Sequence, residues 1–231
     1  EGVENLSENY KTFEACIEKL KSNAIITIYS EGLCVNEWHL RNLKKGTARL
    51  AVKAWEEDIP LKVLPVGINY SSFSKFGKNV FLNFGDPITK GEIDFTDGDG
   101  LRHQQFNNKL QEELGKLVFE IPMSEKKLKK VKLTVPVPLF RKILFFVPGL
   151  LGWLLHAPLY YPLKKFAAVK TKYTGHYDSV ITALLLILYL PYLLLLTGAF
   201  WIISGCWYSI LLIVLMPCSA WAFVQIKKQL D

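Results

Sequence analysis

The residues best suited to chemistry lie between two predicted elements near the start of this 231-residue chain. Glu31 and Gly32 follow a short apolar run, and Lys44 and Lys45 precede a stretch with helical spacing. Open α/β sheets bind ligands beyond the carboxyl ends of their strands, so Glu31 and Gly32 are expected at a binding edge. A helix N-terminus favours phosphate, because its free N–H groups and its dipole attract anions. The spacing therefore places Lys44 and Lys45 where a phosphate would bind.

Two elements must position these side chains. The β-branched and aromatic run at residues 25–29 predicts a strand that is covered on both faces. Helical spacing of apolar and small residues predicts a helix from about Gly46 to Glu57. The other predicted elements are helices near 5–23 and 106–121 and strands at 61–70 and 80–84. Because helices alternate with apolar strands, the predicted fold class is α/β with a mainly parallel sheet.

The same residues resemble motifs of the PlsC-like glycerolipid acyltransferases, which acylate glycerol-3-phosphate or lysophosphatidate. The family's third motif, Phe-Pro-Glu-Gly with a later Arg, Lys and Gly, stands here as Tyr29-Ser30-Glu31-Gly32, with Lys44 and Gly46 downstream. Its fourth motif, an apolar strand around a proline, is similar to residues 63–68, and residues 80–87 resemble the piece that follows. Two positions depart from the family pattern, because Ser30 replaces the usual Pro and Cys34 stands where Arg is expected.

The resemblance implies a substrate-binding role for five residues. Glu31 would hydrogen-bond the hydroxyl groups of the acceptor, and Gly32, beside Ser30, would let the backbone approach it. Arg41 and Lys44 would meet the phosphate, since the usual Arg is missing at position 34. The family also implies acyl-CoA or acyl carrier protein as the donor, with no bound cofactor and no metal.

The family's catalytic base belongs to a His-x4-Asp motif, in which the Asp orients the imidazole that accepts the proton of the acceptor hydroxyl. The four histidines of this chain are followed, five positions on, by Lys44, Asn108, Tyr161 and Ile181. Because none of these is Asp, and because the chain opens on Glu1, we expect the motif upstream of Glu1. The chain is interpreted as the C-terminal part of an acyltransferase, without a catalytic residue of its own and inactive as a fragment.

Charge is distributed unevenly along the chain. Residues 1–125 hold 15 basic and 19 acidic side chains, whereas residues 126–177 hold 11 basic and no acidic ones. The positive net charge of +7 therefore arises from the segment 126–177. Because apolar sequence is interleaved with the basic residues of this segment, a nucleic-acid partner is not expected. The four cysteines lack zinc-type spacing, and Asp97-Gly98-Asp99-Gly100 lacks the EF-hand spacing, so no metal site is predicted.

The C-terminal half predicts a membrane region. Residues 179–226 carry no charge over 48 positions, and one helix of that length would measure about 70 Å against a hydrocarbon thickness of about 30 Å. Two spans at about 179–200 and 204–224, joined by a tight turn, fit better. Residues 143–163 are apolar but contain three prolines, which favours an interfacial or re-entrant segment. Lysines before and after the hairpin predict that its ends, and the acyltransferase domain, face the cytoplasm.

These observations divide the chain into four predicted parts. They are the C-terminal part of an acyltransferase domain (1–122), a basic juxtamembrane linker (123–142), a membrane-interface or re-entrant segment (143–177) and a transmembrane helical hairpin (178–231). The lysines at 126–132 either form a solvated linker or attract anionic lipid.

The predicted function is that of a multi-pass membrane O-acyltransferase of phospholipid biosynthesis. As the resemblance implies, it would move a fatty acyl group from an acyl thioester to glycerol-3-phosphate or a lysophospholipid, with the phospholipid membrane as a further partner. The alternative is a non-catalytic, membrane-anchored lipid-binding or scaffolding protein with a degenerate acyltransferase fold. A transporter is disfavoured, because the two spans contain no ionisable residue.

Overall fold

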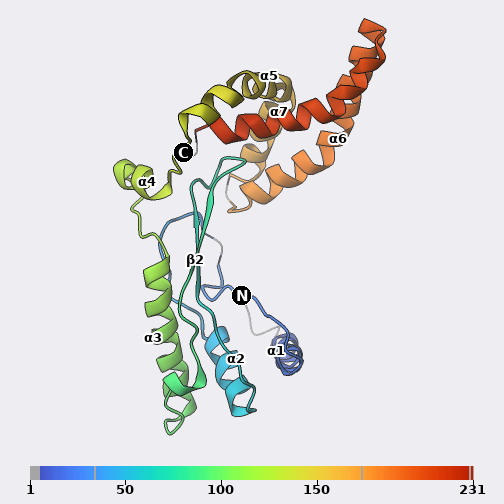
Figure 1. Cartoon of the computed structure of the whole chain (residues 1–231). Coiled ribbons are helices and arrows are strands. Elements are labelled where there is room, and N and C mark those ends of the chain that lie inside the picture. The colour runs from blue at the N-terminus through green and yellow to red at the C-terminus, as the bar shows by residue number, and fades with distance from the viewer. Residues whose placement is uncertain (1–5, 34, 173, 229, 231) are drawn as a thin grey trace. The chain divides into compact units, whose positions relative to one another are not determined.

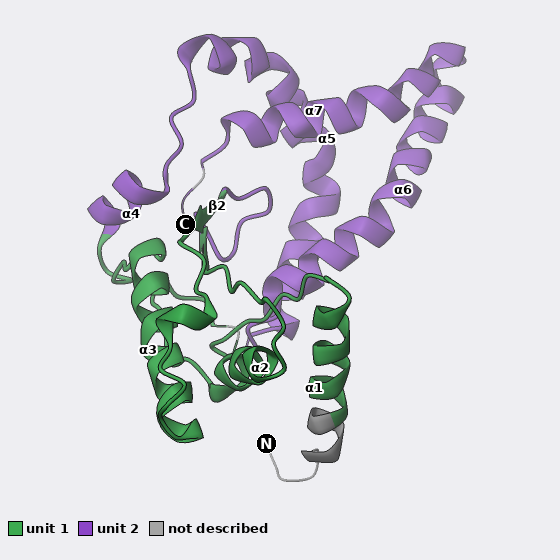
Figure 2. Ribbon diagram, turned by 60° about the horizontal axis from the view of Figure 1, so that its bottom comes forward, with its two compact units in different colours: residues 1–69, 80–125 green, residues 70–79, 126–231 purple. Residues whose placement is uncertain are grey.

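The computed structural model describes residues 6–33, 35–172, 174–228 and 230, with the backbone alone for residues 6–10. The chain divides into two compact units, which Figure 2 colours separately. Unit 1 comprises residues 1–69 and 80–125, and unit 2 comprises residues 70–79 and 126–231. Within the described residues most of the chain is helical, and the sheet has two strands.

Unit 1 combines helices with a β-hairpin (Figure 1). Its elements are α1 (Leu6–Lys21), α2 (Lys45–Glu56), β1 (Val66–Tyr70, whose last residue belongs to unit 2), β2 (Val80–Phe84), the 3-10 turn η2 (Lys90–Glu92) and α3 (Asp99–Leu117). The strands run antiparallel, because pairing continues beyond β1 and β2 through an antiparallel bridge between Val63 and Ile88. The Gly85 N–H also donates to the carbonyl oxygen of Pro65 over 3.0 Å.

The prediction of a mainly parallel sheet is wrong. Residues 25–29 are not in a strand, and Ile25 is 96% exposed. A strand exists through backbone pairing with a neighbour, and in the described part of the chain β1 and β2 pair with each other instead. The strand at Val80–Phe84 is confirmed, whereas the one predicted at 61–70 begins only after Pro65, which has no N–H to donate.

The core of unit 1 gathers around α2. Trp55 and Phe106 are 1% and 0% exposed, and their rings meet edge-on with centroids 5.8 Å apart. On another side of α2, Leu50 and Ala54 pack in a second cluster with Ile17 of α1. The apolar residues whose spacing predicted α2 therefore lie on the buried face of this helix.

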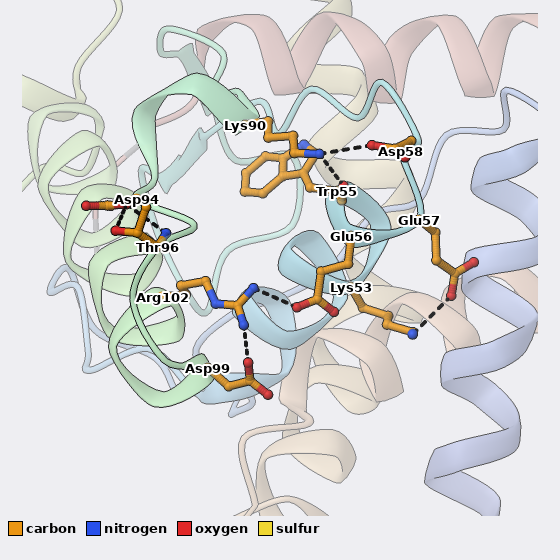
Figure 3. Close-up of polar contacts among 10 residues, drawn as sticks. All are labelled: Lys53, Trp55, Glu56, Glu57, Asp58, Lys90, Asp94, Thr96, Asp99 and Arg102. Carbon is orange, nitrogen blue, oxygen red and sulfur yellow. Dashed lines mark hydrogen bonds and ion pairs between the residues drawn. The ribbon is translucent and has the colours of Figure 1, made fainter.

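Polar contacts fix the C-terminal end of α2 (Figure 3). The Lys90 ammonium donates to the carbonyl oxygen of Trp55 over 2.7 Å and pairs with Asp58 over 3.1 Å. Arg102 of α3 pairs with Glu56 over 2.7 Å. Lys90 thus satisfies a backbone carbonyl near the C-terminal end of α2, where carbonyl groups lack intrahelical partners. The ion pair between Arg102 and Glu56 joins α2 to α3.

Unit 2 consists mainly of long helices. The elements of unit 2 are α4 (Lys126–Leu133), α5 (Leu139–Lys170), α6 (Tyr177–Ser204), the 3-10 turn η3 (Trp207–Leu211) and α7 (Leu212–Ile226). The basic segment after residue 125 forms a short helix, α4, within the region predicted as a linker. Among the described residues, three helical stretches are long and apolar enough to cross a membrane: Leu139–Lys170, Tyr177–Ser204 and Trp207–Ile226.

The segment predicted from its prolines as interfacial or re-entrant forms the helix α5, and its placement relative to a membrane stays a prediction. It remains one helix of 32 residues through Pro148, Pro158 and Pro162, and it bends along its length (Figure 2). Proline removes one backbone hydrogen bond and kinks a helix without necessarily ending it. The two predicted spans correspond to α6 and to η3 with α7, and Gly205 ends α6 in the left-handed conformation at φ 65°. How many times the chain crosses a membrane stays a prediction.

Two glycines of α5 allow it to contact α7 closely. A Cβ atom on Gly152 would lie 2.1 Å from the carbonyl oxygen of Ser219, and one on Gly149 would lie 2.9 Å from a side-chain carbon of Ile226. Small residues at helix interfaces are typical of membrane proteins, because they let backbones approach. Apolar side chains elsewhere in unit 2 stay exposed, such as Leu186 at 79% and Ile202 at 86%, which suits contact with lipid.

Candidate functional site

The site predicted from the sequence is built on a tight turn at residues 29–32. The Gly32 N–H donates to the carbonyl oxygen of Tyr29 over 3.0 Å, and Gly32 adopts φ +67°. That left-handed conformation carries no penalty for glycine, because glycine has no Cβ. A Cβ at this position would also lie 3.1 Å from Cγ of Lys44. The turn therefore brings Gly32 against the residue that precedes α2.

Two hydrogen bonds join this turn to the start of α2. The backbone N–H of Lys44 donates to the carbonyl oxygen of Ser30 over 2.7 Å. The hydroxyl groups of Ser30 and Thr47 lie 2.8 Å apart in a second hydrogen bond. Lys44 is the N-cap residue of α2, and its side chain accepts no hydrogen bond from the first N–H groups of the helix. The structure thus brings Ser30, Gly32 and Lys44 together, while their predicted role in substrate binding stays a prediction.

Glu31 is partly buried and faces a basic neighbour. Burial raises the pKa of the Glu31 carboxyl, while a hydrogen bond from the backbone of Arg41 and the positive charge of Arg41 oppose that rise. The Arg41 guanidinium donates to the carboxylate of Glu37. Arg41 is therefore near Glu31, but its guanidinium already has an anionic partner that sequence reasoning did not identify.

A second pair near Glu31 was also missed. His39 Nδ1 lies 2.8 Å from Glu120 Oε2, and the other oxygen of Glu120 accepts the Leu40 N–H over 3.0 Å. The hydrogen bond from His39 to the Glu120 carboxylate raises the pKa of His39, which is largely exposed. The partners stand 81 positions apart in the sequence, so no local spacing could have revealed them.

A polar cleft of about 700 Å³ lies between the N-terminal half of α2 and α3 in unit 1. Its lining includes two cations, Lys45 and Arg49, together with His103 and several amides; the amide side chains are Asn42, Gln104, Asn107, Asn108 and Gln111. Burial and the nearby Arg49 lower the pKa of His103, which favours the neutral imidazole. None of the five predicted site residues is among those that line this cleft. Its amide donors and cations suit an anionic ligand.

The chemistry available at the turn is recognition of an anion and of hydroxyl groups. Lys44 and Lys45 make no ion pair among the described residues, and they stand at the N-terminal end of α2, where phosphate is favoured. Within the described ranges, no group of three or more His, Cys, Asp or Glu side chains could hold a metal ion. Cys34, the departure from the family's Arg, lies outside the described residues.

Comparison with known proteins relates this chain to glycerolipid acyltransferases. It is 33% identical to glycerol-3-phosphate O-acyltransferase 1 of Saccharomyces cerevisiae over 85 aligned residues, which cover 34% of this chain and 11% of that protein. It is 27% identical to glycerol-3-phosphate O-acyltransferase 2 of the same yeast over 119 residues, which cover 51% of this chain and 15% of that protein. The matches therefore span only a small part of these relatives. No family model and no solved structure matches the chain.

Proposed function

We propose that this protein is part of a PlsC-like acyltransferase that transfers a fatty acyl group from an acyl thioester to glycerol-3-phosphate or a lysophospholipid. The similarity to two yeast glycerol-3-phosphate O-acyltransferases supports this class of reaction. The observation that carries the proposal is the turn at Tyr29–Gly32, which is hydrogen-bonded to the N-terminal end of α2. It holds a carboxylate and a glycine backbone next to Lys44, a cation that makes no ion pair with any residue that the structure describes.

Each residue of the turn receives a distinct role in this proposal. The partly buried carboxylate of Glu31 accepts hydrogen bonds from hydroxyl groups of the acceptor. Gly32 lets the turn pack closely against the side chain of Lys44, and Lys44 attracts the phosphate of the acceptor. Arg41 contributes charge while Glu37 orients its guanidinium. Ser30 acts through the hydrogen bond between its hydroxyl and Thr47, which keeps the turn against α2.

The long apolar helices support a membrane location for the reaction. An acylated product is insoluble in water, so the enzyme must meet the acceptor or release the product at a bilayer. We place α5, α6 and α7 in the membrane, with residues 1–122 on the cytoplasmic face, where acyl-CoA or acyl carrier protein can deliver the donor. The proton of the acceptor hydroxyl requires a general base, which in this proposal belongs to a His-x4-Asp motif outside this sequence.

Acyl transfer in membranes that contain the protein expressed from its whole reading frame tests this function. Labelled acyl-CoA is supplied with glycerol-3-phosphate or with lysophosphatidate, and turnover is compared among the unchanged protein, Glu31→Ala and Glu18→Ala. Loss of hydrogen bonds to a charged group is expected to lower turnover by about 10- to 100-fold in Glu31→Ala. Glu18 is an exposed residue of α1, so Glu18→Ala serves as the matched control.

Equal turnover in Glu31→Ala and the unchanged protein would overturn the role of Glu31. If the whole protein transfers no acyl group to either acceptor but still binds lipid vesicles, the non-catalytic alternative replaces the proposal. One observation favours that alternative: Ser30, at the family's Pro position, uses its hydroxyl in an internal hydrogen bond.

A further inference from the structure

Residues 70–79 form a turn whose shape is fixed by its own serines. The N–H of Ser71 donates to the carbonyl oxygen of Asn79, and the Ser71 hydroxyl oxygen accepts the Asn79 N–H, both over 2.9 Å. The hydroxyl oxygen of Ser72 accepts the N–H groups of Ser74 and Lys75 over 3.1 and 2.9 Å. Both serines are at most 1% exposed, so the turn is internally satisfied and presents Lys75 and Lys78 from a defined backbone.

This turn packs against the helices of unit 2, the unit to which it belongs (Figure 2). Gly77 adopts φ +65°, and a Cβ there would lie 2.8 Å from a methyl group of Val224 in α7. Tyr160 of α5 hydrogen-bonds the backbone of Phe76. Lys78 forms an ion pair with Asp178 in the first turn of α6. The turn therefore makes a separate contact with each of the three long helices.

Four lysines converge where the turn meets these helices. Lys75 and Lys78 come from the turn, Lys164 from the last turns of α5, and Lys227 directly follows α7. A Cβ on Gly77 would lie 3.5 Å from the ammonium nitrogen of Lys227. Burial and repulsion from the other three ammonium groups lower the pKa of Lys227 to about 8. These positive charges are thus close enough to oppose one another.

The anions that could balance this cluster are scarce within unit 2. Asp178 is the one acidic residue among the described residues of this unit, and it already pairs with Lys78. Lys227 makes no ion pair among the described residues. Holding several cations together costs free energy unless an anion lies between them. A bound anion would therefore stabilise this cluster of lysines.

We propose that Lys75, Lys78, Lys164 and Lys227 bind a phosphate group at the ends of the apolar helices of unit 2. This site goes beyond the proposed acyl transfer and does not depend on it. Lysine binds phosphate as a compact point charge, and a phosphomonoester with up to two negative charges suits this excess of cations. Because Lys164 and Lys227 stand near the ends of long apolar helices, the phosphate of a lipid headgroup can reach them while its acyl chains lie along α5 and α7.

Calorimetric titration of the full chain in phosphatidylcholine nanodiscs tests the site. The ligands are dihexanoyl phosphatidate, glycerol-3-phosphate and inorganic phosphate, with dihexanoyl phosphatidylcholine as the negative control. We expect phosphatidate to bind, and Lys227→Gln and Lys164→Gln each to weaken it about tenfold or more. The matched controls are the neighbouring lysines, as Lys228→Gln and Lys165→Gln, which should change affinity less than twofold. Binding of the lipid alone identifies a headgroup, and equal binding of the soluble phosphates identifies a soluble ligand.

Amine labelling provides a readout that does not depend on the variants folding. With a pKa of about 8, Lys227 reacts faster than an ordinary lysine near neutral pH, and a bound phosphate would slow that reaction by favouring the charged ammonium. Mass spectrometry of the unchanged protein should show labelling of Lys227 falling severalfold when phosphatidate is added, while labelling of Lys228 stays constant. Equal loss of binding in Lys227→Gln and Lys228→Gln, or unchanged labelling of Lys227, would overturn the site in favour of diffuse attraction to lysine-rich surfaces.

Discussion

The backbone N–H of Lys44 donates to the carbonyl oxygen of Ser30 over 2.7 Å, which closes the loop between the two residues. The side chain of Lys44 passes beside Gly32, which adopts φ +67°. A Cβ on Gly32 would lie 3.1 Å from Lys44 Cγ. Glu31 lies between Ser30 and Gly32, so the position of this carboxylate depends on a glycine and on the start of a helix. This dependence makes the loop sensitive to small changes.

Gly32→Ala should destabilise the protein. The alanine must adopt a left-handed conformation, at a cost of roughly 1 kcal/mol, and its methyl group must displace the side chain of Lys44. Gly46→Ala is the matched control, because its Cβ meets nothing within 4 Å and alanine favours the helix by about 1 kcal/mol. Thermal unfolding in detergent, followed by circular dichroism, should give a lower Tm for Gly32→Ala and an equal or higher Tm for Gly46→Ala. The opposite order would contradict the described turn.

Gly152→Ala should separate α5 from α7. The added Cβ would overlap the carbonyl oxygen of Ser219, 2.1 Å away, so the backbones must move apart at a cost of about 1–3 kcal/mol. Gly198→Ala in α6 is the control, since nothing lies within 4 Å of its Cβ. Cross-linking between the helices with a short thiol-reactive reagent, with Phe145 and Trp221 each replaced by Cys because their rings meet at 5.0 Å, should lose efficiency only in the Gly152 variant. Unchanged cross-linking would count against this close approach.

Glu120→Gln should lower the pKa of His39 toward its ordinary value of 6.5, because the hydrogen bond to Glu120 is the main cause of the rise. The raised pKa means that the charged pair favours the folded state below the unfolded pKa of about 6.5, and that this contribution is lost as pH rises through the folded value. NMR titration of ¹³C-labelled histidine in detergent micelles measures the shift. Glu112→Gln, which removes a partner of Lys116 on α3, should leave His39 unchanged. A pKa that stays raised without Glu120 would refute the pairing.

Phe106→Ala should unfold unit 1 more readily than any surface change. Phe106 is 0% exposed against Trp55, and emptying such a site costs about 3–5 kcal/mol. Phe84→Ala removes the same side chain where it is 63% exposed, and we expect less than about 1 kcal/mol there. Urea unfolding of the full chain in detergent, followed by circular dichroism, compares the two variants. Similar midpoints would mean that the Trp55–Phe106 contact is not central to the core.

The sequence predicted those elements whose signal is local. Helical spacing identified the helix that buries Trp55, and the uncharged run at 179–226 identified the two apolar helices with a turn at Gly205. The apolar run at 25–29 misled, because a strand depends on a distant partner and none of the described residues pairs with it. The prolines of α5 do not end the helix, since the remaining hydrogen bonds of a long helix tolerate single losses, and whether it is interfacial or re-entrant stays a prediction.

In the candidate site, too, local motifs were recognised from the sequence, whereas contacts between distant residues were not. Glu31, Gly32 and Lys44 were found from one short motif, and the structure brings them together at one turn. The pairing of His39 with Glu120 and that of Arg41 with Glu37 required tertiary information. The lysine cluster was hidden as well, because Lys75 and Lys227 are more than a hundred positions apart and meet only when the turn at 70–79 packs against α7.

The chain leaves unit 1 after Asn69 and returns at Val80, which has a practical consequence for anyone who shortens this protein. A water-soluble version cut after Glu125 would keep residues 70–79 but lose Asp178, Val224 and Tyr160, the partners of that segment. Its apolar and basic side chains would then be left in solvent and invite aggregation. Grafting a two-residue Asn-Gly hairpin turn in place of residues 71–79, which keeps Tyr70 at the end of β1, should yield a better-behaved soluble fragment than truncation alone.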